Sequence, residues 1–456
     1  MTFLLSTAMI ERELDAFVDD FYQNNTKALM LTGARQTGKT YAIRRIGKRY
    51  KCFVEINFVD RPEAVDLLKN ADGLDDLLLR VSALTHKELV PGETLIFFDE
   101  VQKCPDIVTA TKFLVDDGRY RYALSGSLLG VELKDLRSEP VGYIDVKEVY
   151  PLTLNEFFKA VGVGVGVIKA LENAWIQHKP VDDFIHAQIM RLFRIYLLVG
   201  GMPAAVKKYL QTNDLQAVRQ EQRAILRLYK RDIAQYDPDN KLYLDEILDL
   251  IPSELNAKNK RFILKNLNEK AKFSRLVNDF LWLKNAGAAI PTYNVEEPKL
   301  PLLLAKSRNL FKLFQNDVGL LASQYSQNVM PQVLEGDASV NFGSIYENVV
   351  AQELLAQGYP LYYFNSKHQG EVDFLIEQDN AVLPIGVKSG KDYLRHNALN
   401  NLLSTPEYGI QRSVVLHNDN LKDTGTILYA PIYMVAFMRP QEPKTFLAPP
   451  DLSGLR

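Results

Sequence analysis

An unbroken phosphate-loop pattern, Gly33 to Thr40, constrains the fold of this chain more than any other stretch. The eight residues GARQTGKT fit G-x-x-x-x-G-K-[ST] without a mismatch. An apolar run, 28–31, precedes the pattern and a helical segment, 41–50, follows it. Glycines let the backbone wrap a phosphate, and the N–H groups at a helix N-terminus supply positive potential. The sequence therefore predicts a strand, a Gly-rich turn and a helix that together bind a nucleoside triphosphate.

The side chains of this loop have predicted roles in binding ATP. Lys39 would reach the β- and γ-phosphates, and the Thr40 hydroxyl would bind magnesium. Arg35 in the loop and Arg137 further along the chain are candidates for compensating charge in the transition state. The predicted nucleotide-binding residues are Gly33, Ala34, Arg35, Gln36, Thr37, Gly38, Lys39, Thr40 and Tyr41.

A second apolar strand, 94–98, ends in two acids that complement the loop. Phosphoryl transfer needs a bound magnesium ion as well as a cradled phosphate. We expect Asp99 to hold that ion and Glu100 to orient and deprotonate the attacking water. At the end of the next predicted strand, Ser125 or Ser127 would sense the γ-phosphate, unless these serines only form a turn.

Strands and helices alternate through the first third of the chain. The continuous apolar runs suit strands that are covered by helices on both faces, as in a parallel α/β sheet with its ligand beyond the carboxyl ends of the strands. The predicted strands are 28–31, 52–57, 94–99, 121–127 and 142–149, and the predicted helices are 10–21, 41–50, 62–69, 74–84, 107–115 and 154–160.

Four motifs in a fixed order, GARQTGKT, LIFFDEVQ, ALSGSLLG and PLTLNEFF, carry a resemblance to a known group of proteins. The chain resembles the bacterial and archaeal AAA-like ATPases that have a C-terminal domain of unknown function. The resemblance continues through 196–203 and 311–320 into the last domain. It implies an ATP-hydrolysing first half in which Glu100 matches the glutamate beside the magnesium-binding acid.

Composition bounds the class of protein. With 456 residues, 47% of them hydrophobic and 24% charged, the chain has enough apolar material for several cores. The net charge of -2 means that any contact with nucleic acid depends on local patches. Two cysteines, Cys52 and Cys104, give no disulfide framework. We see no signal peptide and no apolar run that could span a membrane, so we expect a cytoplasmic protein.

The middle of the chain is predicted to be helical and locally basic. A stripe of basic residues on 217–234 reads either as a solvated face or as a contact to nucleic acid. Residues 256–285 hold eight basic residues against two acids and read as helix (261–268), helix (274–283) and extended segment (289–295), the outline of a winged helix. This segment would bind DNA, or serve only as a lid that packs on the ATPase.

The predicted domain boundaries follow these changes in pattern. The alternating glycines of 161–167 do not fit G-x-G-x-x-G, and we interpret them as a connection after the helix at 154–160. The predicted domains are an AAA-like P-loop ATPase domain (1–160), a helical linker region (161–215), a helical and winged-helix-like domain (216–335) and a restriction-endonuclease-like domain (336–456).

The last domain poses a second chemical question. An amphipathic helix is predicted to start at 343, followed by two strands, 370–376 and 382–388. This order resembles the restriction-endonuclease-like core, and Glu347, Asp373 and Lys388 match its acid, aspartate and lysine. The glutamate expected two positions before the lysine is Gly386. Losing one carboxylate weakens a magnesium site, although Glu371 is predicted on the same strand face as Asp373.

These patterns predict a Mg-dependent ATPase whose nucleotide state acts on a nucleic-acid or protein partner through the C-terminal domains. Two other functions stay open. One is an ATP-gated DNA nuclease, and the other is an adaptor that binds nucleotide without hydrolysing it.

Overall fold

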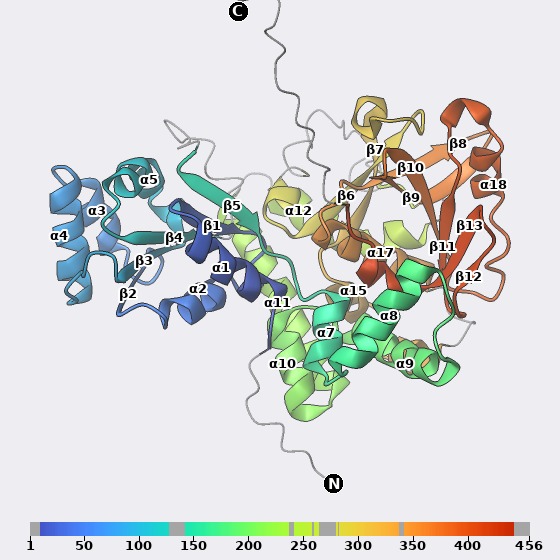
Figure 1. Ribbon diagram of the computed structural model, residues 1–456, viewed down its shortest axis with the longest axis horizontal. Coiled ribbons are helices and arrows are strands. Elements are labelled where there is room, and N and C mark those ends of the chain that lie inside the picture. Colours follow the sequence, from blue (N-terminus) through green and yellow to red (C-terminus); the bar gives the residue numbers. More distant parts are fainter. Residues whose placement is uncertain are drawn as a thin grey trace, which may run out of the picture.

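The computed structural model describes most of the chain as two lobes joined by helices (Figure 1). A small sheet lies in one lobe, a larger sheet lies in the other, and most of the connecting helices lie between and below them (Figure 1). The described residues are 10–126, 142–236, 241–257, 260–263, 280, 282–336 and 342–441.

The N-terminal lobe is built on a five-stranded sheet with the order β2-β3-β4-β1-β5, in which the paired strands are parallel. This confirms the predicted parallel α/β domain. Strand β1 lies next to β4, so the loop that follows β1 is close to the carboxyl ends of β3 and β4. The strands are β1 (Ala28–Thr32), β2 (Cys52–Asn57), β3 (Thr94–Asp99), β4 (Arg121–Ser125) and β5 (Ile144–Glu148).

Helices cover both faces of this sheet and close two separate cores. Leu29 and Leu31 of β1 pack with α1 and α2 on one face, whereas Ala28 and Met30 pack with α3, α4 and α5 on the other. The alternation follows from the period of two along a strand. The helices are α1 (Glu13–Asn24), α2 (Lys39–Gly47), α3 (Glu63–Lys69), α4 (Leu74–Thr85) and α5 (Pro105–Asp117), with a 3-10 turn, η1, at Val101–Lys103.

A helical region follows and shares its core with the C-terminal lobe. The glycine run differs from its prediction as a connection, because Gly164 caps a helix that already includes Gly166. The helices are α7 (Leu154–Ala160), α8 (Val165–Gln177), α9 (Asp183–Val199), α10 (Pro203–Thr212), α11 (Leu215–Tyr236) and α12 (Lys241–Asn256).

The C-terminal lobe holds an eight-stranded mixed sheet with the order β12-β13-β11-β10-β9-β8-β6-β7. The strands are β6 (Ala289–Val295), β7 (Lys306–Gln315), β8 (Tyr362–Ser366), β9 (Gly370–Gln378), β10 (Ala381–Val387), β11 (Ser413–His417), β12 (Lys422–Asp423) and β13 (Ile427–Pro431). The other elements are α15 (Val318–Gln324), α16 (Val329–Glu335), α17 (Gly343–Ala356), α18 (Asn397–Leu403) and the 3-10 turns η3 (Leu302–Ala305), η4 (Pro406–Tyr408) and η5 (Ile432–Phe437).

Three predictions about this lobe and the segment before it need correction. Strand β6 matches the predicted extended segment 289–295 and forms a hairpin with β7. It also pairs with β8, so the hairpin extends the C-terminal sheet across the predicted boundary at 335 and 336. The predicted helices of the winged-helix outline lie mostly outside the described residues, and the described start of the first, 261–263, is not helical. Helix α17 is not amphipathic, because every residue from Ser344 to Leu354 is buried.

Candidate functional site: the phosphate loop and the strand ends beside it

The phosphate loop has the backbone that its glycines predict. Gly33 (φ 112°) and Gly38 (φ 99°) both lie in the left-handed region, where a side chain is unfavourable. A Cβ atom on Gly33 would also lie 2.4 Å from the carbonyl oxygen of Val149, so this position has no room for one. Gly38 caps α2, which places Lys39 and Thr40 in the first turn of the helix.

Lys39 is folded back onto the loop that precedes it. Its Nζ donates to the carbonyl oxygens of Gly33 (2.9 Å) and Ala34 (2.6 Å), and the side chain is buried. Burial lowers the pKa of Lys39 to about 8, although the nearby carboxylates of Glu100 and Asp99 oppose the shift. The ammonium is therefore held in the loop by two neutral acceptors.

Asp99 collects hydrogen bonds from neutral donors on three neighbouring elements. Thr40 Oγ1 donates to its Oδ2 atom at 3.1 Å, and Asn57 Nδ2 donates to the same atom at 3.0 Å. The Ser125 hydroxyl donates to Oδ1, which also accepts from the backbone N–H of Glu100. Burial raises the pKa of Asp99, and the hydrogen bonds from Ser125 and Thr40 act against it. This confirms that the two motifs come together at one edge of the sheet.

Glu100 leaves the strand in a left-handed conformation with φ 57°. Such a value is uncommon outside glycine and turns the side chain away from the direction of the strand. Gln102 Nε2 donates to Glu100 Oε2 at 2.5 Å, which fixes the carboxylate. Glu100 is half-buried, in contrast to the buried Asp99.

The outer side of the loop touches the helical and C-terminal parts. Arg35 pairs with Asp232 of α11 at 2.8 Å, and the Arg35 carbonyl oxygen lies 3.5 Å from the hydroxyl of Tyr229. A Cβ atom on Gly287 would lie 2.7 Å from the backbone nitrogen of Ala34, so the segment before β6 touches the loop directly. The loop is thus contacted by two regions that follow the sheet in sequence.

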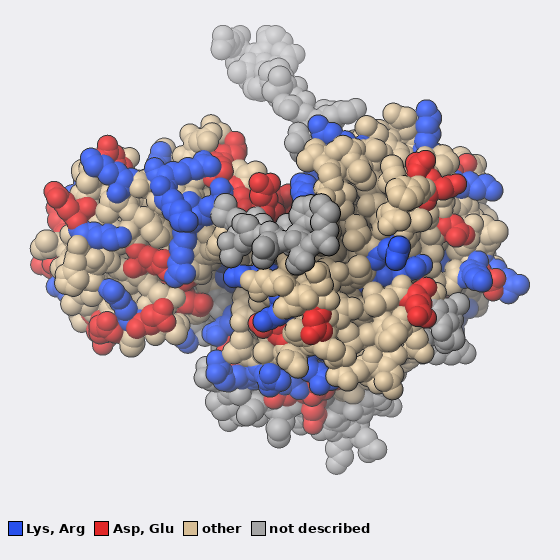
Figure 2. Space-filling view, turned by 90° about the horizontal axis from the view of Figure 1, so that it is seen from below, with Lys and Arg blue, Asp and Glu red and all other residues tan. Residues whose placement is uncertain are grey.

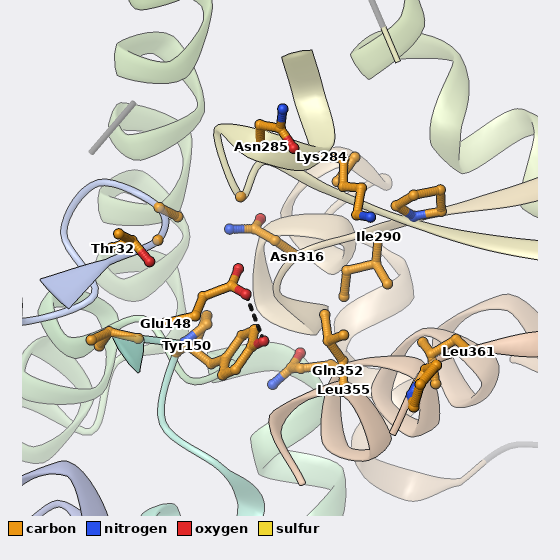
Figure 3. Close-up of a pocket in the computed structure, with 18 of the residues that line it drawn as sticks. Thr32, Glu148, Tyr150, Lys284, Asn285, Ile290, Asn316, Gln352, Leu355 and Leu361 are labelled. Atoms are coloured by element: carbon orange, nitrogen blue, oxygen red, sulfur yellow. Dashed lines mark hydrogen bonds between the residues drawn. The ribbon is translucent and has the colours of Figure 1, made fainter. Parts of the chain in front are cut away.

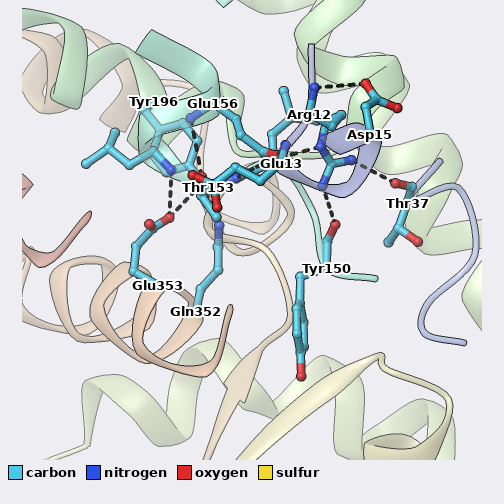
Figure 4. A network of polar contacts seen from close by, with 12 residues as sticks. Arg12, Glu13, Asp15, Thr37, Tyr150, Thr153, Glu156, Tyr196, Gln352 and Glu353 are labelled. Atoms are coloured by element: carbon cyan, nitrogen blue, oxygen red, sulfur yellow. Dashed lines mark hydrogen bonds and ion pairs between the residues drawn. The ribbon is translucent and has the colours of Figure 1, made fainter. Parts of the chain in front are cut away.

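Arg12, before α1, ties the loop to the C-terminal lobe (Figure 4). Its guanidinium donates to the carbonyl oxygens of Thr37 (3.0 Å) and Tyr150 (2.9 Å) and pairs with Glu156 at 3.0 Å. Glu156 belongs to the capping box of α7, and the next N–H in that cap, from Leu154, donates to Glu353 of α17 at 2.9 Å. A buried polar chain therefore runs from the loop to α17.

A cavity of about 730 Å³ lies on the other side of the loop, between the two lobes (Figure 3). Thr32 and Glu148 line it from the N-terminal lobe, and Lys284 and Ile290 line it from the C-terminal lobe. Glu148 accepts a 2.8 Å hydrogen bond from Tyr150 across one wall (Figure 3). Lys39, Asp99 and Glu100 do not line this cavity, so it is separate from the acids at the strand ends.

The remaining predicted loop residues differ in exposure. Thr37 is buried, Gln36 is exposed in a left-handed conformation (φ 64°), and the Tyr41 side chain is 50% exposed. Arg137 and Ser127 lie outside the described residues.

Sequence reasoning missed Asn57, Arg12 and Asp232. The signal for Asn57 was weak but present, because the residue ends an apolar strand, as Asp99 does, and the two are partners in the β2–β3 register. Arg12 directly precedes α1 and Asp232 lies on α11, and both are far from the loop in sequence. No local pattern marks them.

Basic residues of the predicted stripe on α11 make contacts within the protein. Arg219 is buried and donates to the carbonyl oxygens of Ser323 and Tyr325, and Lys230 pairs with Asp249 at 2.6 Å. On the face seen in Figure 2, basic and acidic side chains are interspersed over both lobes. This mixture of both signs agrees with the near-neutral net charge of the whole chain.

The second predicted site is a cluster of ion pairs. Lys312 of β7 lies between Glu371 Oε1 (2.6 Å) and Glu347 Oε2 (3.3 Å), and Lys260 also pairs with Glu347. Burial lowers the pKa of Lys312, but the carboxylates around it outweigh burial and raise the pKa. Asp373 accepts from the backbone N–H of Val387 at 2.8 Å.

Three lysines lower the pKa of Asp373 against the effect of burial, and Lys388 is one of them. The structure therefore brings Glu347, Asp373 and Lys388 into one charged cluster, as predicted. It also adds Lys312, which the sequence did not indicate. Among the described residues, no group of three or more His, Cys, Asp or Glu side chains is arranged to hold a metal ion.

Three segments of the chain match known family models. Residues 25–158 match the family model described as an AAA domain. Residues 25–158 form an AAA-like P-loop domain. Two further segments match families described only as domains of unknown function, residues 190–329 (DUF8612) and residues 342–433 (DUF4143). No curated protein matches the chain.

Three solved structures show remote similarity to this chain. A Walker-type ATPase of Pyrococcus abyssi is 15% identical, with 69% of this chain and 96% of that chain covered and a TM-score of 0.42. The Aeropyrum pernix Orc1 protein in complex with DNA is 13% identical (74% and 95% covered, TM-score 0.29). AMPPCP-bound DnaA from Aquifex aeolicus is 12% identical (61% and 95% covered, TM-score 0.29). At these TM-scores the similarity carries no argument about function.

None of the helices in the described part of the chain is both long and apolar enough to cross a membrane.

Proposed function

We propose that this protein binds Mg-ATP at the phosphate loop and hydrolyses it. The observation that carries the proposal is the contact of Thr40 Oγ1 with Asp99 Oδ2 at 3.1 Å, directly beside Lys39. Hydroxyl and carboxylate oxygens are the ligands that Mg²⁺ prefers, and a single protein carboxylate is typical where the nucleotide supplies the other ligands. Asp99 accepts only from neutral groups in the hydrogen bonds described above, so its charge is available to a cation.

Each side chain would have a defined part in the reaction. The ammonium of Lys39, now bonded to two loop carbonyls, would turn to the β- and γ-phosphates. Bound Mg²⁺ would neutralise charge on the phosphate oxygens. Glu100, held by Gln102, would accept the proton of the attacking water. Ser125, bonded to the same acid as Thr40, would report whether the γ-phosphate is present.

We further propose that the state of the nucleotide acts on the other lobe through the outer contacts of the loop. Arg35 is paired with Asp232, and an ATP phosphate would compete for the same guanidinium. Releasing this pair would free α11 next to Tyr229, whose hydroxyl accepts from Asn316 at 3.1 Å, one residue beyond β7. The loop contacts Asp232, Tyr229 and Gly287, and these three contacts would change together because all of them involve Ala34 or Arg35 of the loop.

A nucleic-acid partner stays a proposal for the basic stretch 256–285. Lys260 in this stretch pairs with Glu347, so it contributes little to a surface charge. Lys284 lines the cavity between the lobes, where an anionic partner could reach it. Binding through such residues would depend on phosphate contacts and weaken steeply with salt.

Phosphate release measured with ATP and Mg²⁺ tests the function, with and without single- and double-stranded DNA. We expect hydrolysis by the wild type and its loss in Lys39→Ala. Lys48→Ala is the matched control, because Lys48 is an exposed lysine at the end of the same helix. Tight binding of ATP without phosphate release would favour the adaptor, and DNA cleavage that Asp373→Ala abolishes would favour the nuclease.

A further inference from the structure

A buried ammonium fills the centre of the charged cluster in the C-terminal lobe. Lys312 is fully buried, and its Nζ lies between the carboxylates of Glu371 and Glu347 and 5.0 Å from the centre of the Tyr363 ring. The lysine comes from β7 and its partners come from β9 and α17, so three elements converge on one positive charge.

The surrounding groups balance this charge without a metal. Lys260 takes the other oxygen of Glu347, and a backbone N–H donates to Asp373. Among the described residues, three lysines and three acids interact in this cluster, namely Lys260, Lys312, Lys388, Glu347, Glu371 and Asp373. Buried charges are stable only when paired in this way, and a divalent cation would have to displace an ammonium that has no access to water.

Strand β10, where the nuclease pattern expects a glutamate, also lacks room for that side chain at Gly386. A Cβ atom at Gly386 would lie 3.0 Å from Leu399 Cδ1 and 3.9 Å from a Val415 methyl group. A glutamate at this position would therefore extend toward apolar side chains of α18 and β11. The atoms nearest to such a side chain are thus apolar.

We infer that the ammonium of Lys312 takes the place that a divalent cation occupies in a metal-dependent nuclease core, so that this lobe is held together by an internal cation. Glu347, Glu371 and Asp373 are then counter-ions of a lysine. They are not metal ligands. The C-terminal lobe accordingly acts without a bound metal, and this inference is independent of ATP hydrolysis at the phosphate loop.

The first test measures Mn²⁺ binding by electron paramagnetic resonance without nucleotide, in the full chain carrying Asp99→Asn to remove the phosphate-loop acid. We expect no Mn²⁺ site in this protein. Bound Mn²⁺ that is lost on adding Asp373→Asn would overturn the inference.

The second test exchanges the internal cation for an external one. Lys312→Met, in the same background, removes the ammonium that Glu371 and Glu347 share and should lower the melting temperature by roughly 10 °C. Added Mn²⁺ should restore most of that loss, because it replaces the missing positive charge. Lys306→Met is the matched control on the same strand, since the Lys306 ammonium packs over the Tyr293 ring at 3.6 Å, and Mn²⁺ should not change its melting temperature.

A third variant keeps the test decisive if Lys312→Met does not fold. Lys312→Met combined with Glu347→Gln removes one of the two carboxylates that contact Lys312 together with the lysine, so it should melt above the single variant and gain less from Mn²⁺. The inference fails if Mn²⁺ stabilises the Lys306 and Lys312 variants equally, or if it stabilises neither of them.

Discussion

Each lobe brings acids together in a small cluster, but the groups that contact these acids differ between the two lobes. Asp99 in the AAA-like domain accepts from hydroxyl, amide and backbone N–H groups. Glu347 in the C-terminal lobe accepts from two ammonium groups, those of Lys260 and Lys312. The first acid therefore meets only neutral donors in these hydrogen bonds, whereas the second is already paired with ammonium groups.

This difference shows how similar residues serve different purposes. A carboxylate bound by neutral donors is oriented yet still attracts a cation. A carboxylate that shares a buried ion pair contributes to the fold, and removing either partner leaves an uncompensated charge. The type of donor around each acid is therefore a better guide to its role than the acid itself.

The largest expected effect separates chemistry from binding in the AAA-like domain. Glu100→Gln should bind ATP with nearly unchanged affinity and hydrolyse it about 100-fold or more slowly, because the amide cannot accept the proton of water. Stopped-flow phosphate release and equilibrium binding of a fluorescent ATP analogue measure the two properties. Normal turnover would remove Glu100 from its role, and loss of binding would make it a positioning residue.

The next effect concerns stability, and it should appear only in the C-terminal lobe. Glu347→Gln leaves Lys260 and Lys312 with one carboxylate fewer and should lower the free energy of unfolding by about 3 kcal/mol. Asp99→Asn, in contrast, replaces a carboxylate that accepts only from neutral groups in the hydrogen bonds described above, and it should leave stability within about 1 kcal/mol of the wild type. Chemical denaturation of both variants checks the pair. Equal losses would erase the distinction between the two lobes.

Much of the nucleotide site is predictable because its signals are local. The loop, the acidic strand end and their order along the chain lie in short patterns, and the strands of the AAA-like domain follow from apolar runs. Thr40, Asp99 and Ser125 meet as expected. Asn57 was missed because its importance comes from the β2–β3 register, which the sequence does not state.

The C-terminal cluster is harder to predict because its decisive residue comes from another segment. Lys312 lies before the boundary drawn at 335 and 336, in a strand that was expected to belong to a separate domain. Its role depends on β7 joining the sheet of β9. Helix α17 was predicted to have a solvent face, but tertiary packing buries it on every side. Neither outcome has a signature in the local pattern.

A third effect follows from the pKa of Lys39, which burial lowers to about 8. The protonated lysine is the form that attracts phosphate, so ATP affinity should be full below pH 8 and fall as the pH rises through it. Between pH 7 and pH 9 we expect roughly a tenfold rise in the Kd for ATP. Isothermal titration calorimetry across this range measures it. Lys39→Arg stays charged throughout and should show a flat profile.

The smallest expected effect concerns the contact between the loop and α11. Asp232→Asn frees Arg35 to contact the phosphates, so it should tighten ATP binding about fivefold. The gain should vanish when Arg35→Ala is also present. Fluorescence titration of the two single variants and the double variant gives this coupling directly. A gain that persists without Arg35 would exclude the ion pair as its cause.

Counting bound Mn²⁺ tests the contrast between the two lobes most directly. With a non-hydrolysable ATP analogue present, electron paramagnetic resonance should find one Mn²⁺ per chain. Asp99→Asn should abolish this signal, and Asp373→Asn should leave it intact. A signal that survives Asp99→Asn and disappears in Asp373→Asn would contradict the account, because the C-terminal acids would then be the metal ligands.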